Sequence, residues 1–149
     1  MNLIAWSQNM TRQAAEAVGA TLVSKNQLFE QADFLTIHVA FSSRTSGLIG
    51  AAELARMKPT ARLINTSRGP ICDTDALIAA LKEGRLGYAG LDVYDKEPLP
   101  IDHPLRTCPN VILTPHIGYV TDENYRGWFP QIVENIVGFL DGKPQRVIG

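Results

Sequence analysis

Short apolar runs alternate with helix-like segments along most of this chain, and this alternation limits the possible folds more than any other feature of the sequence. The runs are rich in β-branched, Leu and aromatic residues, and most have polar, Gly or Pro residues beside them. Strands separated by helices usually form a parallel sheet, because each helix crosses over the sheet before the next strand begins. We expect strands at residues 3–6, 21–23, 34–39, 62–65, 88–93 and 111–113.

Helix start and stop signals lie between these runs. Shorter helices are expected at residues 11–18, 51–57 and 73–82, which end close to Gly19, Pro59 and Gly84. A longer helix is expected over residues 121–140, where Pro130 predicts either a kink or a later start. The sequence thus predicts an α/β fold, a partial doubly wound parallel sheet with a long C-terminal helix, as one domain over residues 1–149.

Composition and charge exclude several classes of function. The 149 residues are 45% hydrophobic, and 14 basic against 15 acidic side chains leave a formal net charge of -1. No cluster of Lys or Arg is present to bind nucleic acid or an anionic membrane. Cys72 and Cys108 lie far apart without partners at ligand spacing, so we expect no metal site and no disulfide framework. With no secretion signal in the sequence, we expect a cytoplasmic protein.

Polar residues follow three successive strands of the predicted sheet. Arg68 comes after the strand at 62–65, a group of acidic residues that includes Asp92 and Glu97 follows the next, and His116 follows the third. Each alone is more simply explained as a surface or loop residue. The ends of parallel strands meet at one edge of the sheet, however, where ligands bind. Reduction of a 2-keto acid needs a cation, a proton donor and a carboxylate partner, and these three residue types supply them.

These segments resemble the D-isomer-specific 2-hydroxyacid dehydrogenases over nearly the whole chain. Residues 64–69 (INTSRG) resemble the arginine motif of that family, residues 92–98 (DVYDKEP) its acidic motif, and residues 114–118 (TPHIG) its histidine motif. The resemblance implies that Arg68 binds the substrate carboxylate and carbonyl, that His116 is the general acid/base, and that Glu97 hydrogen-bonds the ring of His116. It also implies that the final helix returns to a substrate domain.

The resemblance further implies a nicotinamide dinucleotide cofactor. Asp92 resembles the residue that faces the nicotinamide carboxamide, and Thr66 and Gly118 belong to the matching motifs. His38 lies in a segment that resembles the strand and loop beside the adenosine half, although Ala40 stands where many members have proline. Ser7 and Gln8 occupy the position where NAD-dependent relatives usually carry an acidic residue for the ribose. NAD is the first expectation, and these neutral residues make NADP the second.

One part of the family pattern is missing from the sequence. The glycine-rich turn G-x-G-x-x-G, which holds the pyrophosphate at a helix N-terminus, does not occur. The chain begins at what resembles the second strand of the cofactor domain, so we expect the C-terminal part of such an enzyme, without its first strand–helix unit. We expect it to act on a small 2-keto or 2-hydroxy acid only with that unit, and to form a homo-oligomer or associate with a missing N-terminal segment.

Three other functions stay open at this point. The chain could be a dinucleotide-sensing module without catalysis, as in corepressor relatives that keep the same motifs. It could be an inactive fragment. A cofactor domain of the formate or alanine dehydrogenase type shares the architecture, but the spacing of the Arg, Glu and His residues fits the hydroxyacid dehydrogenases better.

Overall fold

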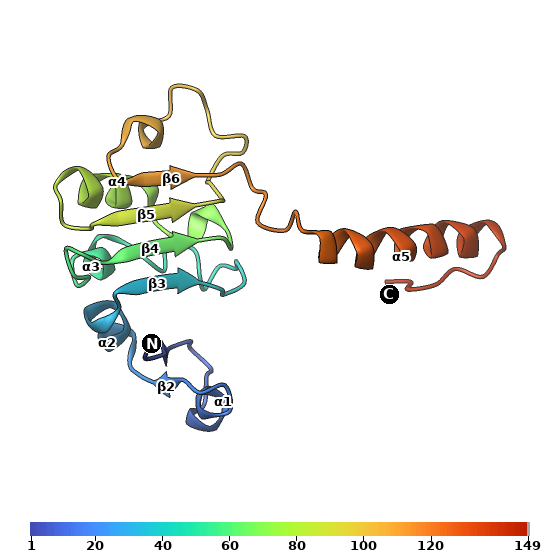
Figure 1. Cartoon of the computed structure of the whole chain (residues 1–149), viewed down its shortest axis with the longest axis horizontal. Helices are drawn as coiled ribbons and strands as arrows, with labels where there is room; N and C mark the ends of the chain where they lie inside the picture. Colours follow the sequence, from blue (N-terminus) through green and yellow to red (C-terminus); the bar gives the residue numbers. More distant parts are fainter. Residues whose placement is uncertain (149) are drawn as a thin grey trace. The chain divides into compact units, whose positions relative to one another are not determined.

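The structure, a computed structural model that describes residues 1–148, divides into two compact units, Met1–His116 and Ile117–Gly149. The first unit holds all the strands of the described residues (Figure 1). Its strands are β1 (Ile4–Ala5), β2 (Thr21–Leu22), β3 (Phe34–Ile37), β4 (Arg62–Asn65), β5 (Tyr88–Leu91) and β6 (Val111–Leu113). Its helices are α1 (Arg12–Glu16), α2 (Lys25–Gln31), α3 (Ala51–Leu54), α4 (Thr74–Lys82) and the 3-10 turns η1 (Gly69–Ile71) and η2 (Pro104–Thr107).

All strand pairs are parallel, which confirms the predicted α/β class. A four-stranded sheet has the order β3-β4-β5-β6, and β1 pairs with β2 in a separate two-stranded sheet. Among the described residues, β1 and β3 therefore each have one edge without a strand partner. The predicted strands at 3–6, 21–23, 34–39 and 88–93 are shorter in the structure, because pairing stops where a neighbouring strand ends.

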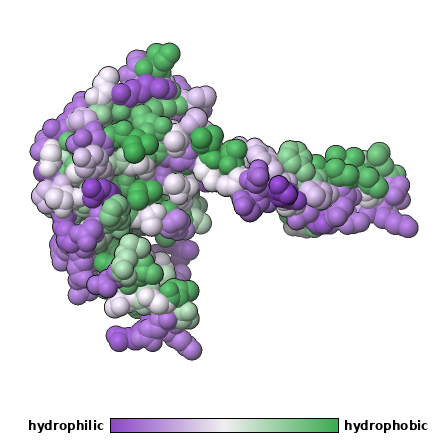
Figure 2. Space-filling view, viewed as in Figure 1, coloured by the Kyte–Doolittle hydropathy of each residue, from purple (hydrophilic) through white to green (hydrophobic). Residues whose placement is uncertain are grey.

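The four-stranded sheet buries one face and leaves the other open. Buried and less buried residues alternate along β3, β4 and β5, as expected when one side packs against helices. The buried core includes Leu63 and Leu77, which are almost completely inaccessible to solvent. On the other face Phe34, Tyr88 and Ile112 are exposed. Figure 2 shows hydrophobic residues gathered over this unit. We call the sheet face that carries Phe34, Tyr88 and Ile112 the open face.

Helix caps explain where several helices begin. The side chain of Asp73 accepts a hydrogen bond from the Ala76 amide at the start of α4, and Thr121 does the same for Asn124 in the second unit. Helix α2, which we did not predict, begins with a capping box between Ser24 and Gln27. This reciprocal pair of hydrogen bonds stabilises a helix that has little apolar periodicity.

The second unit contains one long helix, α5 (Asp122–Leu140), which agrees with the prediction. Pro130 lies inside this helix and does not delay its start. No helix among residues 1–148 is both long and apolar enough to cross a membrane. Seven apolar residues of α5 are at least half exposed, namely Phe129, Ile132, Val133, Ile136, Val137, Phe139 and Leu140.

Candidate active site

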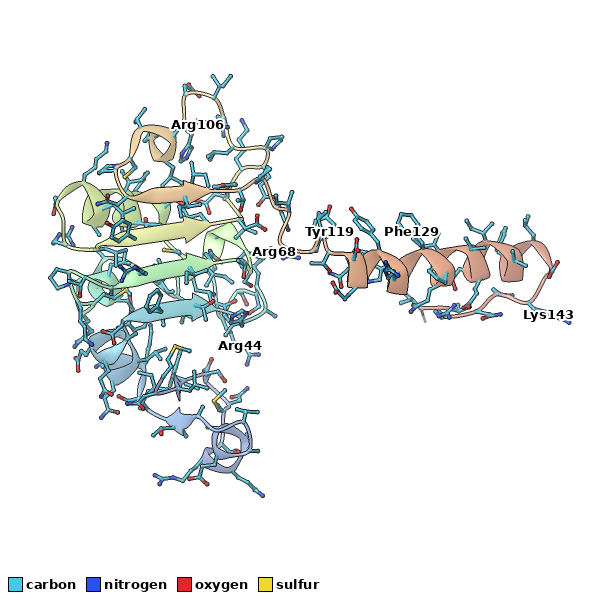
Figure 3. The ribbon with its side chains drawn as sticks, viewed as in Figure 1. Arg44, Arg68, Arg106, Tyr119, Phe129 and Lys143 are labelled. Carbon is cyan, nitrogen blue, oxygen red and sulfur yellow. The ribbon has the colours of Figure 1, made fainter. Side chains whose placement is uncertain are left out.

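The ends of β4, β5 and β6 place the predicted catalytic residues at one edge of the sheet. The register pairs Asn65 with Leu91, and Leu91 with Leu113, so the three loops that follow begin side by side. Figure 3 shows Arg68 at this edge, just beyond the tip of β4. The parallel topology thus brings together residues that are far apart in the sequence.

Asn65 shapes the loop that carries Arg68. Its side chain is 1% exposed, donates to the Arg68 carbonyl at 3.0 Å and accepts from the Ser67 amide at 3.1 Å. The Ser67 hydroxyl donates to the Val39 carbonyl at 2.7 Å, which ties this loop to the end of β3. The Arg68 side chain is exposed, and one nitrogen of its guanidinium donates to the Ser67 carbonyl at 2.6 Å. A fixed backbone thus presents an accessible guanidinium.

Glu97 and His116 form an ion pair beside this loop. The distance from His116 Nδ1 to Glu97 Oε2 is 2.6 Å, and the second oxygen of Glu97 accepts from the Tyr94 amide at 2.8 Å. The carboxylate is therefore held at both oxygens. His116 has a φ of 58°, in the left-handed region that few residues other than Gly adopt. Strained backbone of this kind often occurs at functional sites.

Electrostatics favour the ionised form of Glu97. Burial alone would raise the pKa of this carboxyl, but hydrogen bonds from His116 and from the Tyr94 amide lower it. The positive charges of His116 and Arg68 also lower it, so the net pKa of Glu97 lies below its ordinary value of 4.5. Because the positive charge of Arg68 lowers the pKa of Glu97, the Arg68 guanidinium acts on the Glu97–His116 pair. At neutral pH Glu97 is a carboxylate that can stabilise an imidazolium.

We predict that Glu97→Gln reduces the acid dependence of stability. A lowered pKa means that the ionised Glu97 stabilises the fold above pH 4.5, and that this contribution disappears as the pH falls through the folded-state pKa. The variant should be less stable than the wild type at pH 7, and the difference should shrink below about pH 4. Thermal unfolding across this range measures it. An equal difference at pH 7 and pH 3 would contradict the assignment.

Asp92 lies at the end of β5, where the sequence predicts a cofactor-binding residue. Its side chain is buried, and one carboxylate oxygen accepts a hydrogen bond from the Thr114 hydroxyl at 2.5 Å. Thr66, another predicted cofactor residue, is exposed directly after β4. Gly118 belongs to the second unit. Asp92 and Thr66, both predicted cofactor residues, thus follow two adjacent strands at the same edge as Arg68.

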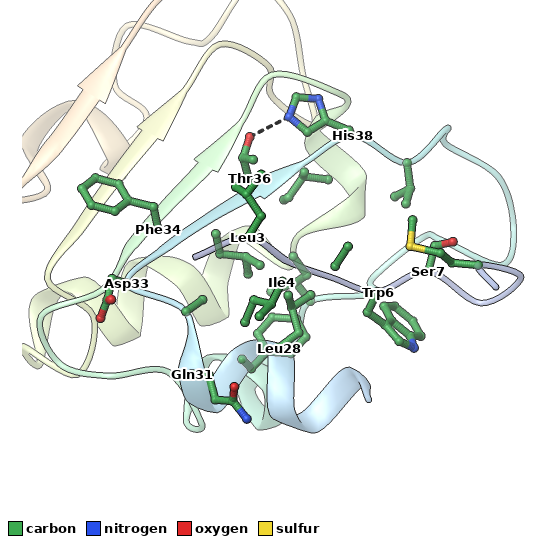
Figure 4. Close-up of a pocket in the computed structure, with 18 of the residues that line it drawn as sticks. Leu3, Ile4, Trp6, Ser7, Leu28, Gln31, Asp33, Phe34, Thr36 and His38 are labelled. Carbon is green, nitrogen blue, oxygen red and sulfur yellow. Dashed lines mark hydrogen bonds between the residues drawn. The ribbon is translucent and has the colours of Figure 1, made fainter. Parts of the chain in front are cut away.

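The predicted adenosine-side residues Ser7 and His38 come after β1 and β3, and His38 lies at the same edge of the sheet as the Arg68 loop. Ser7 and His38 line a cleft of about 950 Å³ between β1 and β3, and Gln8 is exposed next to it. A hydrogen bond of 3.0 Å joins the His38 ring to the Thr36 hydroxyl (Figure 4). Most of the cleft lining is apolar, with Ile4, Leu28 and Phe34 among its residues. We call this space the β1–β3 cleft.

Three contributors to the site were not predicted from the sequence. Asn65 and Thr114 fix the loops around Arg68 and Asp92, and Tyr94 provides the amide that holds Glu97. Asn65 could have been recognised, because Asn before a turn often bonds to backbone two residues later. The contact between Thr114 and Asp92 joins two strands, so no local pattern reveals it. No group of three potential metal ligands occurs among the described residues.

Parallel strands with a polar site at their carboxyl ends define a ligand-binding α/β domain. The profile of the family described as "D-isomer specific 2-hydroxyacid dehydrogenase, NAD binding domain" matches residues 1–118. The chain belongs to this family, which confirms the resemblance found in the sequence.

Relatives and solved structures agree with this assignment. The chain is 43% identical to a Synechocystis D-3-phosphoglycerate dehydrogenase over 98% of its length, and 42% identical to the Thermococcus litoralis glyoxylate reductase over 96%. A Vibrio cholerae phosphoglycerate oxidoreductase has a similar structure, with a TM-score of 0.86 and 33% identity over 95% of the chain. The chain spans only 26%, 43% and 46%, respectively, of these longer proteins.

Proposed function

We propose that this chain provides the substrate arginine and the acid/base pair of an NAD(P)-dependent D-2-hydroxyacid dehydrogenase. The observation that carries the proposal is the 2.6 Å contact between Glu97 and His116, at the strand edge that also carries Arg68. A protonated imidazole, its carboxylate partner and an accessible guanidinium are the groups that reduction of a 2-keto acid requires. The substrate is thus a small 2-keto or 2-hydroxy acid.

Each residue has a separate role in the proposed reaction. The guanidinium of Arg68 binds the substrate carboxylate through parallel hydrogen bonds and orients the keto group. The cofactor, when bound, supplies the hydride that the keto carbon accepts. The carbonyl oxygen gains a proton from His116, which gives the 2-hydroxy acid, and solvent reprotonates the neutral imidazole. Glu97 keeps the ring oriented and favours its charged form.

The residues present fit the two ends of a dinucleotide better than its middle. The buried Asp92 carboxylate and Thr66, which follow adjacent strands, are proposed for the nicotinamide end, and Gly118 of the second unit is proposed separately as a cofactor residue. Ser7, Gln8 and His38 are proposed for the adenosine end. NAD is the first candidate, and NADP the second, because Ser7 and Gln8 place no carboxylate against a 2′-phosphate. The 149 residues contain no glycine-rich turn for the pyrophosphate.

We propose that the β1–β3 cleft receives a strand, turn and helix that supply this missing phosphate site. Both strands that border the cleft, β1 and β3, have an edge without a strand partner among the described residues. An apolar strand in the cleft would join them into one sheet in which β1 and β2 lie on one side and β3–β6 on the other. The greater length of the relatives is consistent with such a segment.

The handedness of crossovers predicts where the helix of that segment would lie. After the inserted strand, the chain would continue to β1 and then β2, moving across the sheet in one direction. From β3 to β6 it moves across the sheet in the opposite direction. Right-handed crossovers in opposite directions place their helices on opposite faces. The added helix would therefore cover the open face, which carries Phe34, rather than the face that α3 and α4 cover.

In the second unit, we propose that the apolar side of α5 packs against a substrate domain within the same dehydrogenase subunit.

Enzyme assays on a polypeptide that carries the strand–turn–helix segment before residue 1, together with a substrate domain, test the function. We expect this longer polypeptide to reduce glyoxylate or hydroxypyruvate with NADH or NADPH. Glu97→Gln removes the negative charge beside His116, so the pH above which reduction fails should move downward. A pH profile unchanged by this variant would remove Glu97 from the mechanism. Dinucleotide binding without turnover by the wild type would favour the non-catalytic sensing module instead.

A further inference from the structure

The loop that carries Arg68 and the loop that carries Glu97 are in direct backbone contact. Gly69 is buried, and a Cβ atom on it would lie 2.0 Å from the Tyr94 carbonyl carbon and 2.5 Å from the Asp95 nitrogen. Both atoms belong to the backbone, so neither can rotate away. Any side chain at position 69 must push the two loops apart. Gly69 is therefore required for close approach rather than for an unusual backbone angle.

Tyr94 links the Glu97 loop to the two strand ends beneath it. Its side chain is 9% exposed, and its hydroxyl donates toward the Leu91 carbonyl at 3.0 Å and the Thr114 carbonyl at 2.8 Å. These carbonyls lie at the ends of β5 and β6, so one hydroxyl joins the strand before Asp92 to the segment before His116. Burial and then the charge of Asp92 raise the pKa of Tyr94, which keeps the hydroxyl protonated.

Two further side chains hold the Glu97 loop through three hydrogen bonds. The Thr74 hydroxyl donates to Asp95 at 2.6 Å from the start of α4. The guanidinium of Arg106 donates to the Leu99 carbonyl at 2.7 Å and to the Pro100 carbonyl at 2.8 Å. The loop is thus attached both before and after Glu97 in the sequence. Its position relative to the Arg68 loop depends on the Gly69 contact and the Tyr94 hydroxyl.

We propose that Gly69 and Tyr94 are positioning residues that set the distance between Arg68 and the Glu97–His116 pair. Gly69 lets the two loops approach to backbone contact, and Tyr94 locks the Glu97 loop onto the strand ends that precede Asp92 and His116. The proposal builds on the proposed function, since it explains how substrate binding and proton transfer are aligned. Neither residue touches the reacting atoms.

The first test replaces Gly69 by Ala and follows the titration of Glu97 by carboxyl-carbon NMR in the 149-residue chain. Separation of the loops moves the positive charge of Arg68 away from Glu97, so the pKa of Glu97 should rise. Arg68→Met should raise this pKa in the wild type and have no additional effect in the Gly69→Ala background. Gly90→Ala is the matched control, because a Cβ there meets only the Ile64 side chain at 3.9 Å. Equal titration in G69A and the wild type would overturn the role of Gly69.

The second test uses Tyr94→Phe, which keeps the ring and the backbone amide and removes only the hydroxyl. If the Gly69→Ala variant fails to fold, Tyr94→Phe alone tests the positioning role. Tyr88→Phe at the start of β5 is the control, because Tyr88 is 48% exposed. We expect Y94F, unlike Y88F, to raise the pKa of Glu97. A lower melting temperature for Y94F with an unchanged Glu97 titration would show a purely structural role and overturn the proposal.

Kinetics of the longer catalytic polypeptide separate this proposal from the proposed function. Misplacement by about 1 Å can cost on the order of a hundredfold in rate, so G69A should lower kcat far more than it changes dinucleotide affinity. If the wild-type polypeptide is inactive but the titration shifts occur, the proposed function fails and the positioning role stands. If the wild type is active and G69A retains its kcat, the positioning role fails alone.

Discussion

Replacing Arg68 by Ala in the longer catalytic polypeptide should reduce kcat/KM for the keto acid by about 150-fold, which corresponds to about 3 kcal/mol of lost transition-state stabilisation. The guanidinium is accessible beside the Glu97–His116 pair, and its loop is held by the buried Asn65. Alanine leaves that loop intact but removes both donors to the substrate carboxylate. Steady-state kinetics with glyoxylate or hydroxypyruvate measure the loss.

Two other arginine variants sharpen this prediction. Arg68→Lys keeps the charge but cannot make two parallel hydrogen bonds, so it should recover only part of the activity. Arg85→Ala removes an exposed arginine that pairs with Glu83, and it should leave kcat/KM nearly unchanged. Wild-type kcat/KM in R68A would disprove the role of Arg68, whatever the other two variants do.

The 149-residue chain alone should neither reduce a keto acid nor bind a dinucleotide with micromolar affinity. It has no glycine-rich turn to offer backbone N–H groups to the pyrophosphate. Its free strand edges at the β1–β3 cleft and the exposed apolar residues of the open face should also favour self-association. Calorimetry with NADH and NADPH, and light scattering of the same protein, measure both properties.

Addition of a separate strand–turn–helix polypeptide provides the matching gain of function. If this segment occupies the β1–β3 cleft and the open face, it should reduce self-association and restore dinucleotide binding. The control segment has prolines in its strand, which cannot complete the sheet. Micromolar binding of NADH by the chain alone, as a stable monomer, would refute the need for the segment. A stable homodimer that ignores the segment would assign the cleft to a second copy.

Local sequence patterns determined most of the secondary structure. The strand at residues 62–65 is identical in prediction and structure, as is the one at 111–113, because short apolar runs ended by polar residues leave few alternatives. Asp73 and Thr121 mark the starts of α4 and α5 as helix caps. Helix α2 lacks the apolar periodicity that marks the other helices, and only the capping box between Ser24 and Gln27 indicates its start.

The family motifs also made the site residues predictable, but only tertiary structure decided how they are held. Arg68, Glu97 and His116 were identified from three segments, and parallel pairing of β4, β5 and β6 brings those segments to one edge. The contact of Gly69 with the Tyr94–Asp95 peptide and the hydroxyl of Tyr94 between two strand ends depend on the path of the whole chain. Sequence sets residue types and local backbone preferences, whereas distances between loops arise only when the sheet has formed.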